Sequence, residues 1–190
     1  MDRLHTLEYA LRELRHVVGT LDDSVMDAPT NCEPWSVRRL ASHALNNQLL
    51  WAGLVTGQHI VSVEDAMGAV PIDGDLDPVA AEVTAGGMAL WRTDGILDAV
   101  HATPFGDLPG SAVIDFAIID AAAHAWDLSA SLGRPIELDP EQIAAIADVV
   151  AATCNDVAIA HGLIKPATEP PADATETERL MSLSGRNVAR

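Results

Sequence analysis

The sequence predicts an all-α protein. Hydrophobic residues make up 48% of its 190 residues and aromatic residues only 4%, with alanine and leucine the dominant apolar types. This composition is sufficient for a packed core of mainly small aliphatic side chains. No window shows the sustained alternation of apolar and polar residues that is typical of half-buried strands. Several windows instead repeat apolar residues every three or four positions, which is the period of an amphipathic helix.

Apolar periodicity and capping residues predict the first two helices. The first has apolar residues at helical spacing: Leu4, Leu7, Leu11, Leu14 and Val18. It is expected to end near residues 19–23. Ser36 is a suitable N-cap for a second helix that runs to about Gly57, since a serine hydroxyl can accept a hydrogen bond from the first turn. From Gly57 to Asp77 the periodicity is lost, which predicts a long connection.

Proline and glycine delimit the next two predicted helices. Asp77 followed by Pro78 predicts the start of a third helix that reaches about Leu97. Residues 101–110 contain two prolines and two glycines and are expected to form a loop. Ser111 then caps a predicted fourth helix that continues to Gly133, a residue type that commonly follows a helix end. This fourth helix is apolar on nearly every side, which is typical of the central helix of a bundle.

Two further helices are predicted in the C-terminal part. Asp139 and the following proline start a fifth helix that reaches about Ala160. After a proline-rich link, Thr175 and Glu178 form a capping box at the start of a short helix that ends near Ser184. We expect residues 1–190 to form a single helical domain, with the core bundle over about 1–133 and the C-terminal helices over about 139–185.

Charge and segment composition exclude several classes of protein. Acidic residues number 28 and basic residues 11, a net charge of −17, whereas nucleic acids and anionic membranes need a cationic surface. No apolar run approaches the roughly 20 residues of a membrane span. The N-terminus lacks a basic flank followed by an apolar block, so we expect a cytoplasmic protein with Cys32 and Cys154 reduced. The expected partner is a small-molecule substrate, and the expected state is a monomer or a homodimer.

Two histidines and one carboxylate are candidates for a metal site. Asp120 and His124 are four residues apart on the apolar fourth helix and therefore share a face. His43 interrupts an apolar row on the second helix. Two imidazoles and a carboxylate from facing helices are the donor set of an open catalytic metal site. The alternative is structural: the histidines are core residues, and Asp120 and His124 form a buried hydrogen-bonded pair.

Three more residues are candidates for the surroundings of this site. Asn47 lies on the same row as His43, and Trp35 precedes the second helix as a candidate pocket wall. Asp127, one turn beyond His124, is open to three interpretations: a partner of a ligand, an alternative ligand, or an exposed residue. Cys32 has no neighbouring base in the sequence that would activate it as a nucleophile. The chain contains no GxSxG elbow, P-loop or dinucleotide fingerprint.

Two of these regions together resemble a known family. Residues 29–43 follow the pattern Pro-Thr-x-Cys-x-x-Trp-[Ser/Thr]-Val-x-x-Leu-x-x-His, and residues 120–128 follow Asp-x-x-x-His-Ala-Trp-Asp-Leu. This resembles DinB-like proteins related to the N-terminal domain of mycothiol-dependent maleylpyruvate isomerase, in particular their single-domain metal-binding members. The resemblance implies a DinB-like four-helix bundle with additional C-terminal helices. It also implies that His43, Asp120 and His124 hold a divalent metal, with zinc expected first and nickel or manganese as alternatives. In the isomerase the middle ligand is Glu, so Asp120 is a departure.

The resemblance implies an enzyme that uses its metal to activate a low-molecular-weight thiol of the mycothiol type, for transfer or isomerisation. Two alternatives stay open on the sequence. One is a metal-dependent hydrolase that uses metal-bound water, with Asp127 as a possible base. The other is a non-catalytic bundle that binds a metal or a small ligand.

Overall fold

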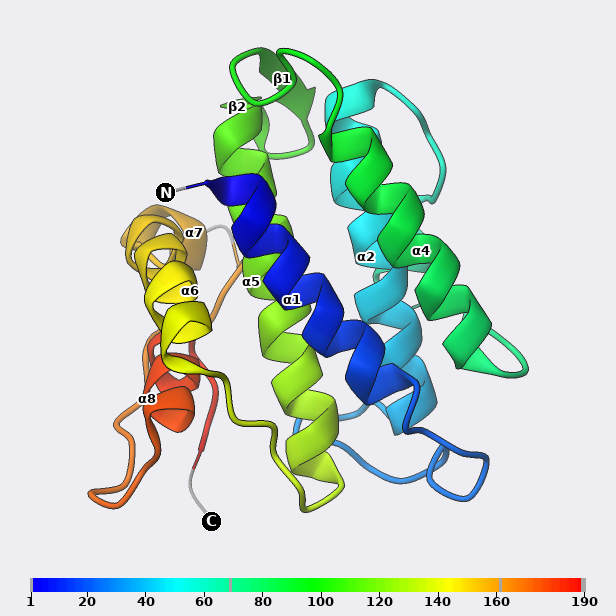
Figure 1. Cartoon of the computed structure of the whole chain (residues 1–190), viewed down its shortest axis with the longest axis vertical. Coiled ribbons are helices and arrows are strands. Elements are labelled where there is room, and N and C mark those ends of the chain that lie inside the picture. The colour runs from blue at the N-terminus through cyan, green and yellow to red at the C-terminus, as the bar shows by residue number, and fades with distance from the viewer. Residues whose placement is uncertain (1, 69, 161, 189–190) are drawn as a thin grey trace. The chain divides into compact units, whose positions relative to one another are not determined.

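The computed structural model describes residues 2–68, 70–160 and 162–188, and the chain consists of two compact units. The first unit covers Asp2–Ile136 and the second begins at Glu137. The predicted all-α class is confirmed, with one small hairpin added (Figure 1). The first unit contains α1 (Arg3–Val18), α2 (Val37–Thr56), α3 (Val63–Ala66), α4 (Leu76–Trp91), β1 (Val100–Thr103), β2 (Gly106–Pro109) and α5 (Gly110–Ser131). The second contains α6 (Pro140–Thr153), α7 (Asp156–Ala160) and α8 (Glu176–Leu183).

The four long helices of the first unit form a bundle. Helices α1 and α2 each pack against both α4 and α5, so the four helices enclose a common core (Figure 1). Helix α5 contributes fully buried apolar residues along its whole length, among them Ile114, Ile118 and Leu128. Because its surface is apolar on nearly every side, α5 packs as a core helix, and three of its ionisable residues, Asp115, His124 and Asp127, are buried with it.

Capping residues set the ends of α2 where the sequence predicts them. The Ser36 side chain accepts a hydrogen bond from the Arg39 backbone N–H and caps the helix start. The helix ends at Gly57, whose left-handed conformation (φ 70°) costs glycine little because it has no Cβ. The connection that follows contains the short helix α3, which is not predicted from the sequence because four residues are too few to show a periodicity.

The predicted start and end of the third helix are both wrong. Helix α4 begins after Asp75, whose carboxylate accepts a hydrogen bond from the backbone N–H of Asp77, so the cap precedes the predicted one. It ends at Trp91 rather than at Leu97, and turns cover the interval. The Asp-Pro pair therefore lies inside the first turn, where proline is tolerated because its missing N–H would have no helical partner.

The predicted loop over residues 101–110 is an antiparallel hairpin. Val100 pairs with Pro109 and Thr103 pairs with Gly106. Strand β2 leads directly into α5, so the fourth predicted helix starts at Gly110 without a side-chain cap, and the predicted cap Ser111 lies inside it. These strands are four residues long and mostly exposed, and they therefore lack the alternating pattern that identifies a half-buried strand.

The second unit differs from the prediction at one point. The predicted helix from Asp139 to Ala160 is two helices, because α6 ends at Thr153 and α7 starts at Asp156. The Asn155 side chain accepts hydrogen bonds from the backbone N–H groups of Val157 and Ala158, which starts a new helix. The capping box at the start of α8 is confirmed, with reciprocal hydrogen bonds between Thr175 and Glu178. Across the described ranges, no helix combines the length and apolar character needed to cross a bilayer.

Candidate functional site

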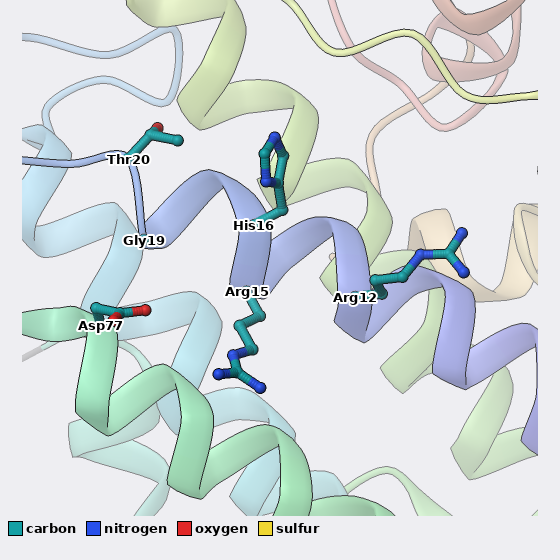
Figure 2. Close-up of a pocket in the computed structure, with 6 residues that line it drawn as sticks. All are labelled: Arg12, Arg15, His16, Gly19, Thr20 and Asp77. Carbon is teal, nitrogen blue, oxygen red and sulfur yellow. The ribbon is translucent and has the colours of Figure 1, made fainter.

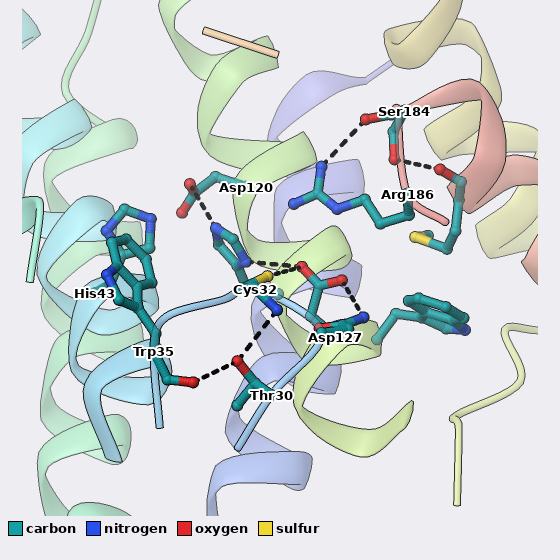
Figure 3. A network of polar contacts seen from close by, with 12 residues as sticks. Thr30, Cys32, Trp35, His43, Asp120, Asp127, Ser184 and Arg186 are labelled. Carbon is teal, nitrogen blue, oxygen red and sulfur yellow. Dashed lines mark hydrogen bonds and ion pairs between the residues drawn. The ribbon is translucent and has the colours of Figure 1, made fainter. Parts of the chain in front are cut away.

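Helices α2 and α5 bring His43, Asp120 and His124 together inside the bundle. One ligand atom from each of the three lies within 4.8 Å of the other two. Both histidines are buried, and Asp120 is largely so. The His43 and His124 rings meet edge to face, with their centroids 4.9 Å apart. The three residues predicted from their spacing as metal ligands are thus neighbours in space, and Figure 3 shows His43 and Asp120 among them.

The orientation of His43 is fixed from both sides of its ring. Its Nδ1 contacts the backbone carbonyl of Ala66 in α3, and since a carbonyl oxygen only accepts, Nδ1 carries the proton. Its Nε2 accepts a hydrogen bond from the side-chain amide of Asn47 at 3.3 Å. The Nε2 lone pair of His43 is therefore directed at the Asn47 amide, and a cation bound to this nitrogen would replace that hydrogen bond.

Two amides hold the Asp120 carboxylate. Asn47 donates to Oδ1 at 2.9 Å, and Gln48 donates to Oδ2 at 3.1 Å. The Asn47 amide thus bridges His43 and Asp120 and presents the positive end of its N–H bonds to both. Asn47 is predicted from the sequence, whereas Gln48 is not. The available signal for Gln48 is its place in a run of three amide residues, 46–48, within an otherwise apolar stretch of the helix.

His124 presents its other nitrogen to Asp120. Its Nδ1 lies 3.0 Å from Asp127 Oδ2, and because a carboxylate only accepts, Nδ1 carries the proton. In the neutral imidazole, Nε2 then has a lone pair, and this atom lies 3.5 Å from Asp120 Oδ1. Lone pairs of Nε2 and Oδ1 that face each other repel unless a positive charge lies between them. The donor set therefore fits a divalent cation with nitrogen and oxygen ligands.

Asp127 lies behind His124, on the Nδ1 side of its ring. It has no solvent-exposed surface, which excludes the interpretation as an exposed helix residue. Its Oδ1 accepts a hydrogen bond from the Asn31 side chain at 3.0 Å, and its Oδ2 accepts from Cys32 Sγ at 3.3 Å (Figure 3). A carboxylate that holds the far nitrogen of a metal-binding histidine is a common partner of such ligands. The structure also gives Cys32 the close carboxylate that its sequence neighbours lack.

Trp35 flanks the cluster on the side of His43. The two rings are tilted, with their centroids 4.6 Å apart. The Trp35 indole is half-buried, and the Arg39 guanidinium lies over it, 5.6 Å from the ring centroid. Trp35 thus lies beside His43, and its role as a pocket wall stays a prediction.

A surface hollow of about 370 Å³ lies elsewhere in the first unit, between α1 and the start of α4. Its lining consists of Arg12, Arg15, His16, Gly19, Thr20 and Asp77. Figure 2 shows that the three basic side chains point in different directions. They do not converge on a common point, so this hollow lacks the arrangement of an anion site.

Comparison with known protein families shows to which family the chain belongs. The model of the mycothiol maleylpyruvate isomerase N-terminal domain matches residues 7–129, which is more than half of the chain. The chain belongs to this family. The matched range starts in α1, ends in α5 and contains every residue of the cluster.

Other proteins are similar to this chain in sequence or in fold. Two uncharacterized proteins of Mycobacterium tuberculosis, Rv0738 of strain H37Rv and MT0763 of strain CDC 1551, are each 28% identical over 149 residues, which cover 74% of this chain and 73% of theirs. The crystal structure of the mycothiol-dependent maleylpyruvate isomerase matches with a TM-score of 0.65 at 18% identity, over 85% of this chain and 71% of that one. The fold is therefore the DinB-like helical fold of that enzyme.

Proposed function

We propose that the protein binds a divalent cation through His43, Asp120 and His124 and uses this site to activate a low-molecular-weight thiol of the mycothiol type. The observation that carries the proposal is the convergence of these three donor atoms within 4.8 Å, with the proton of each imidazole held on its far nitrogen. Three protein ligands leave a coordination position for an exogenous molecule.

Each residue around the cluster has a definite task in this proposal. His43 Nε2, Asp120 Oδ1 and His124 Nε2 bind the cation. The carbonyl of Ala66 and the carboxylate of Asp127 keep the protons on the far nitrogens, so that the two ligand nitrogens stay unprotonated. Gln48 holds the Asp120 oxygen that lies away from Asn47.

The chemistry of a thiol at this site follows from its charge. When bound, a divalent cation lowers the pKa of a coordinated thiol, which supplies a thiolate at neutral pH. The family is named for a mycothiol-dependent domain, and the protein with the matching fold is a mycothiol-dependent isomerase. Both support mycothiol, or a thiol like it, as the cofactor of a transfer or isomerisation reaction. Zinc is the expected cation, with nickel or manganese as alternatives.

The geometry disfavours the hydrolase alternative in the form that uses Asp127 as base. The Asp127 carboxylate is fully buried on the Nδ1 side of His124, whereas the proposed ligand atom of that ring is Nε2. Asp127 also accepts hydrogen bonds from Asn31 and Cys32. It is therefore engaged on the wrong side of the ring to take a proton from a water molecule in the cluster.

Elemental analysis of protein purified without chelator tests the cation site. We expect nearly one equivalent of a single divalent metal in the wild type and strong loss of that metal in His43→Ala and His124→Ala. Asp120→Asn should lose less, since the amide keeps an oxygen but not the charge. His16→Ala is the matched control, because this histidine is exposed on α1, away from the cluster. Equal metal content in all variants would refute the site.

Consumption of an electrophile tests the thiol chemistry. Wild-type protein and His43→Ala are incubated with mycothiol and either maleylpyruvate or an alkylating electrophile, with and without added metal. Loss of the electrophile that requires both the thiol and the metal supports the proposal. Loss that requires the metal alone indicates hydrolysis, and stoichiometric metal binding without turnover indicates a binding protein.

A further inference from the structure

A second group of ligand atoms surrounds the far side of His124. Cys32 Sγ, His124 Nδ1 and an Asp127 carboxylate oxygen all lie within 4.8 Å of one another. Cys32 comes from the segment that precedes α2, whereas His124 and Asp127 are one turn apart on α5. Only His124 is shared with the proposed site of His43 and Asp120, and it takes part in the two groups through different ring nitrogens.

The spacing of these atoms is close to that of ligands around one metal ion. In a tetrahedral zinc site with Zn–S of about 2.3 Å and Zn–N or Zn–O of about 2.0 Å, sulfur and oxygen ligands lie about 3.5 Å apart, and nitrogen and oxygen ligands about 3.3 Å apart. The corresponding distances here are 3.3 Å from Cys32 Sγ to Asp127 Oδ2 and 3.0 Å from His124 Nδ1 to the same oxygen. The third pair, Cys32 Sγ and His124 Nδ1, lies within 4.8 Å.

The surroundings of these ligands are those of a built site. Asn31 donates to the second oxygen of Asp127, and Thr30 Oγ1 accepts a hydrogen bond from the Cys32 backbone N–H (Figure 3). Asp127 and His124 are buried, whereas Cys32 is only half-buried. Among the three ligands, the cysteine is therefore the one most exposed to solvent.

We propose that Cys32, His124 and Asp127 form a second cation site that is selective for strongly thiophilic ions such as Cd²⁺ or Cu⁺. The thiolate favours these soft ions over Mg²⁺, Ca²⁺ and Mn²⁺. On binding, the Cys32 thiol releases its proton to solvent, and the His124 proton moves from Nδ1 to Nε2. The ion thus replaces the two hydrogen bonds that Asp127 Oδ2 now accepts.

Occupation of this second site prevents occupation of the first. A neutral imidazole has one nitrogen lone pair, so His124 cannot bind one ion through Nδ1 and another through Nε2. A soft ion on Nδ1 leaves an N–H group pointing at Asp120, 3.5 Å away, in place of a ligand. This exclusion rests on the proposed function of His43, Asp120 and His124, whereas the second site itself does not. A thiophilic ion would therefore inhibit the proposed reaction without entering the first site.

Cadmium titration of reduced, metal-free protein tests both statements. The readouts are the ultraviolet charge-transfer band of a cadmium–thiolate bond and the number of bound Cd²⁺ ions per chain. We expect one Cd²⁺ with a thiolate band in the wild type and the same result in Cys154→Ser, the matched control for the other cysteine. His43→Ala should keep the band. Cys32→Ser should lose the band and bind one Cd²⁺ at the first site.

Each other outcome overturns a distinct statement. A band that persists in Cys32→Ser, or one that disappears in Cys154→Ser, overturns the second site. Two Cd²⁺ ions per wild-type chain overturn the exclusion. A Cys32→Ser variant that stays folded by circular dichroism and binds no Cd²⁺ overturns the first site, and with it the proposed function, while the second site stands.

Discussion

Replacing Asp127 by asparagine should weaken cation binding although Asp127 is not one of the proposed ligands. Asparagine has nearly the same shape, and its oxygen can still accept the hydrogen bond that Asn31 donates to Oδ1. The Oδ2 position becomes an NH₂ group, which donates and cannot accept from His124 Nδ1. The imidazole proton then moves to Nε2, so the ligand nitrogen of the first site becomes an N–H group.

The size of the effect follows from what the cation must restore. To bind through Nε2, His124 must return its proton to Nδ1, where it now lacks a charged acceptor. A hydrogen bond to a charged group contributes about 1.5–3 kcal/mol. The loss of a partner behind a metal-binding histidine typically lowers affinity about 10- to 100-fold, or about 1.4–2.7 kcal/mol. The two estimates agree, and we expect the dissociation constant to rise within this range.

Isothermal titration calorimetry of metal-free protein with Zn²⁺ and with Mn²⁺ measures this change. Mn²⁺ is the sharper probe, since it avoids the thiolate of Cys32. Asp94→Asn is the matched control, because this aspartate is exposed at the end of α4 and carries the same change of charge. An Asp127→Asn protein that is folded and binds Mn²⁺ with wild-type affinity would refute the orienting role of Asp127.

Two further predictions concern stability. The Asp115 carboxylate is buried, which raises its pKa, and the Arg3 guanidinium at 2.8 Å partly opposes this shift. Arg3→Met should therefore lower the free energy of unfolding by about 2 kcal/mol at neutral pH, less than for a fully buried pair because Arg3 is partly exposed. Without Arg3 the folded-state pKa of Asp115 rises further above its unfolded value. The loss of unfolding free energy should therefore shrink as the pH falls through the folded-state pKa of the variant, because a protonated Asp115 no longer needs the guanidinium. Urea unfolding at about pH 7 and pH 5 measures this loss, and an equal loss at both would refute the reasoning. A Cβ at Gly53 would overlap the Gln58 carbonyl oxygen, so Gly53→Ala should cost about 1–3 kcal/mol. Gly86→Ala, with open space at its Cβ, should instead stabilise α4 by about 1 kcal/mol in the same assay.

The sequence predicts elements well where a local interaction defines them. The Ser36 cap, the Gly57 end and the Thr175 capping box each depend on residues within a few positions, and all three are confirmed. The hairpin and the start of α5 depend on a strand pair that carries little apolar signal. The break between α6 and α7 depends on a single asparagine within a long apolar stretch. Local reasoning has no basis for either feature.

The candidate site divides in the same way. The spacing of Asp120 and His124, together with the apolar row that contains His43, is visible in the sequence, because helical periodicity relates position to face. The contact between Cys32 and Asp127 joins residues 95 positions apart. The anchoring of His43 by Ala66 similarly depends on how the connection after α2 folds back onto that helix. Contacts of this kind follow from tertiary packing and not from spacing.

The contact between His43 and Ala66 also connects the site to the surface. The carbonyl that orients His43 belongs to α3, a four-residue helix in the connection between α2 and α4. Because the cation would bind only when this carbonyl is in place, binding and the local opening of α3 are thermodynamically linked. The amide groups of α3 should therefore exchange with deuterated solvent more slowly when the cation is bound. Hydrogen exchange in this surface helix would thus report occupancy of the interior of the bundle without a substrate or a reaction.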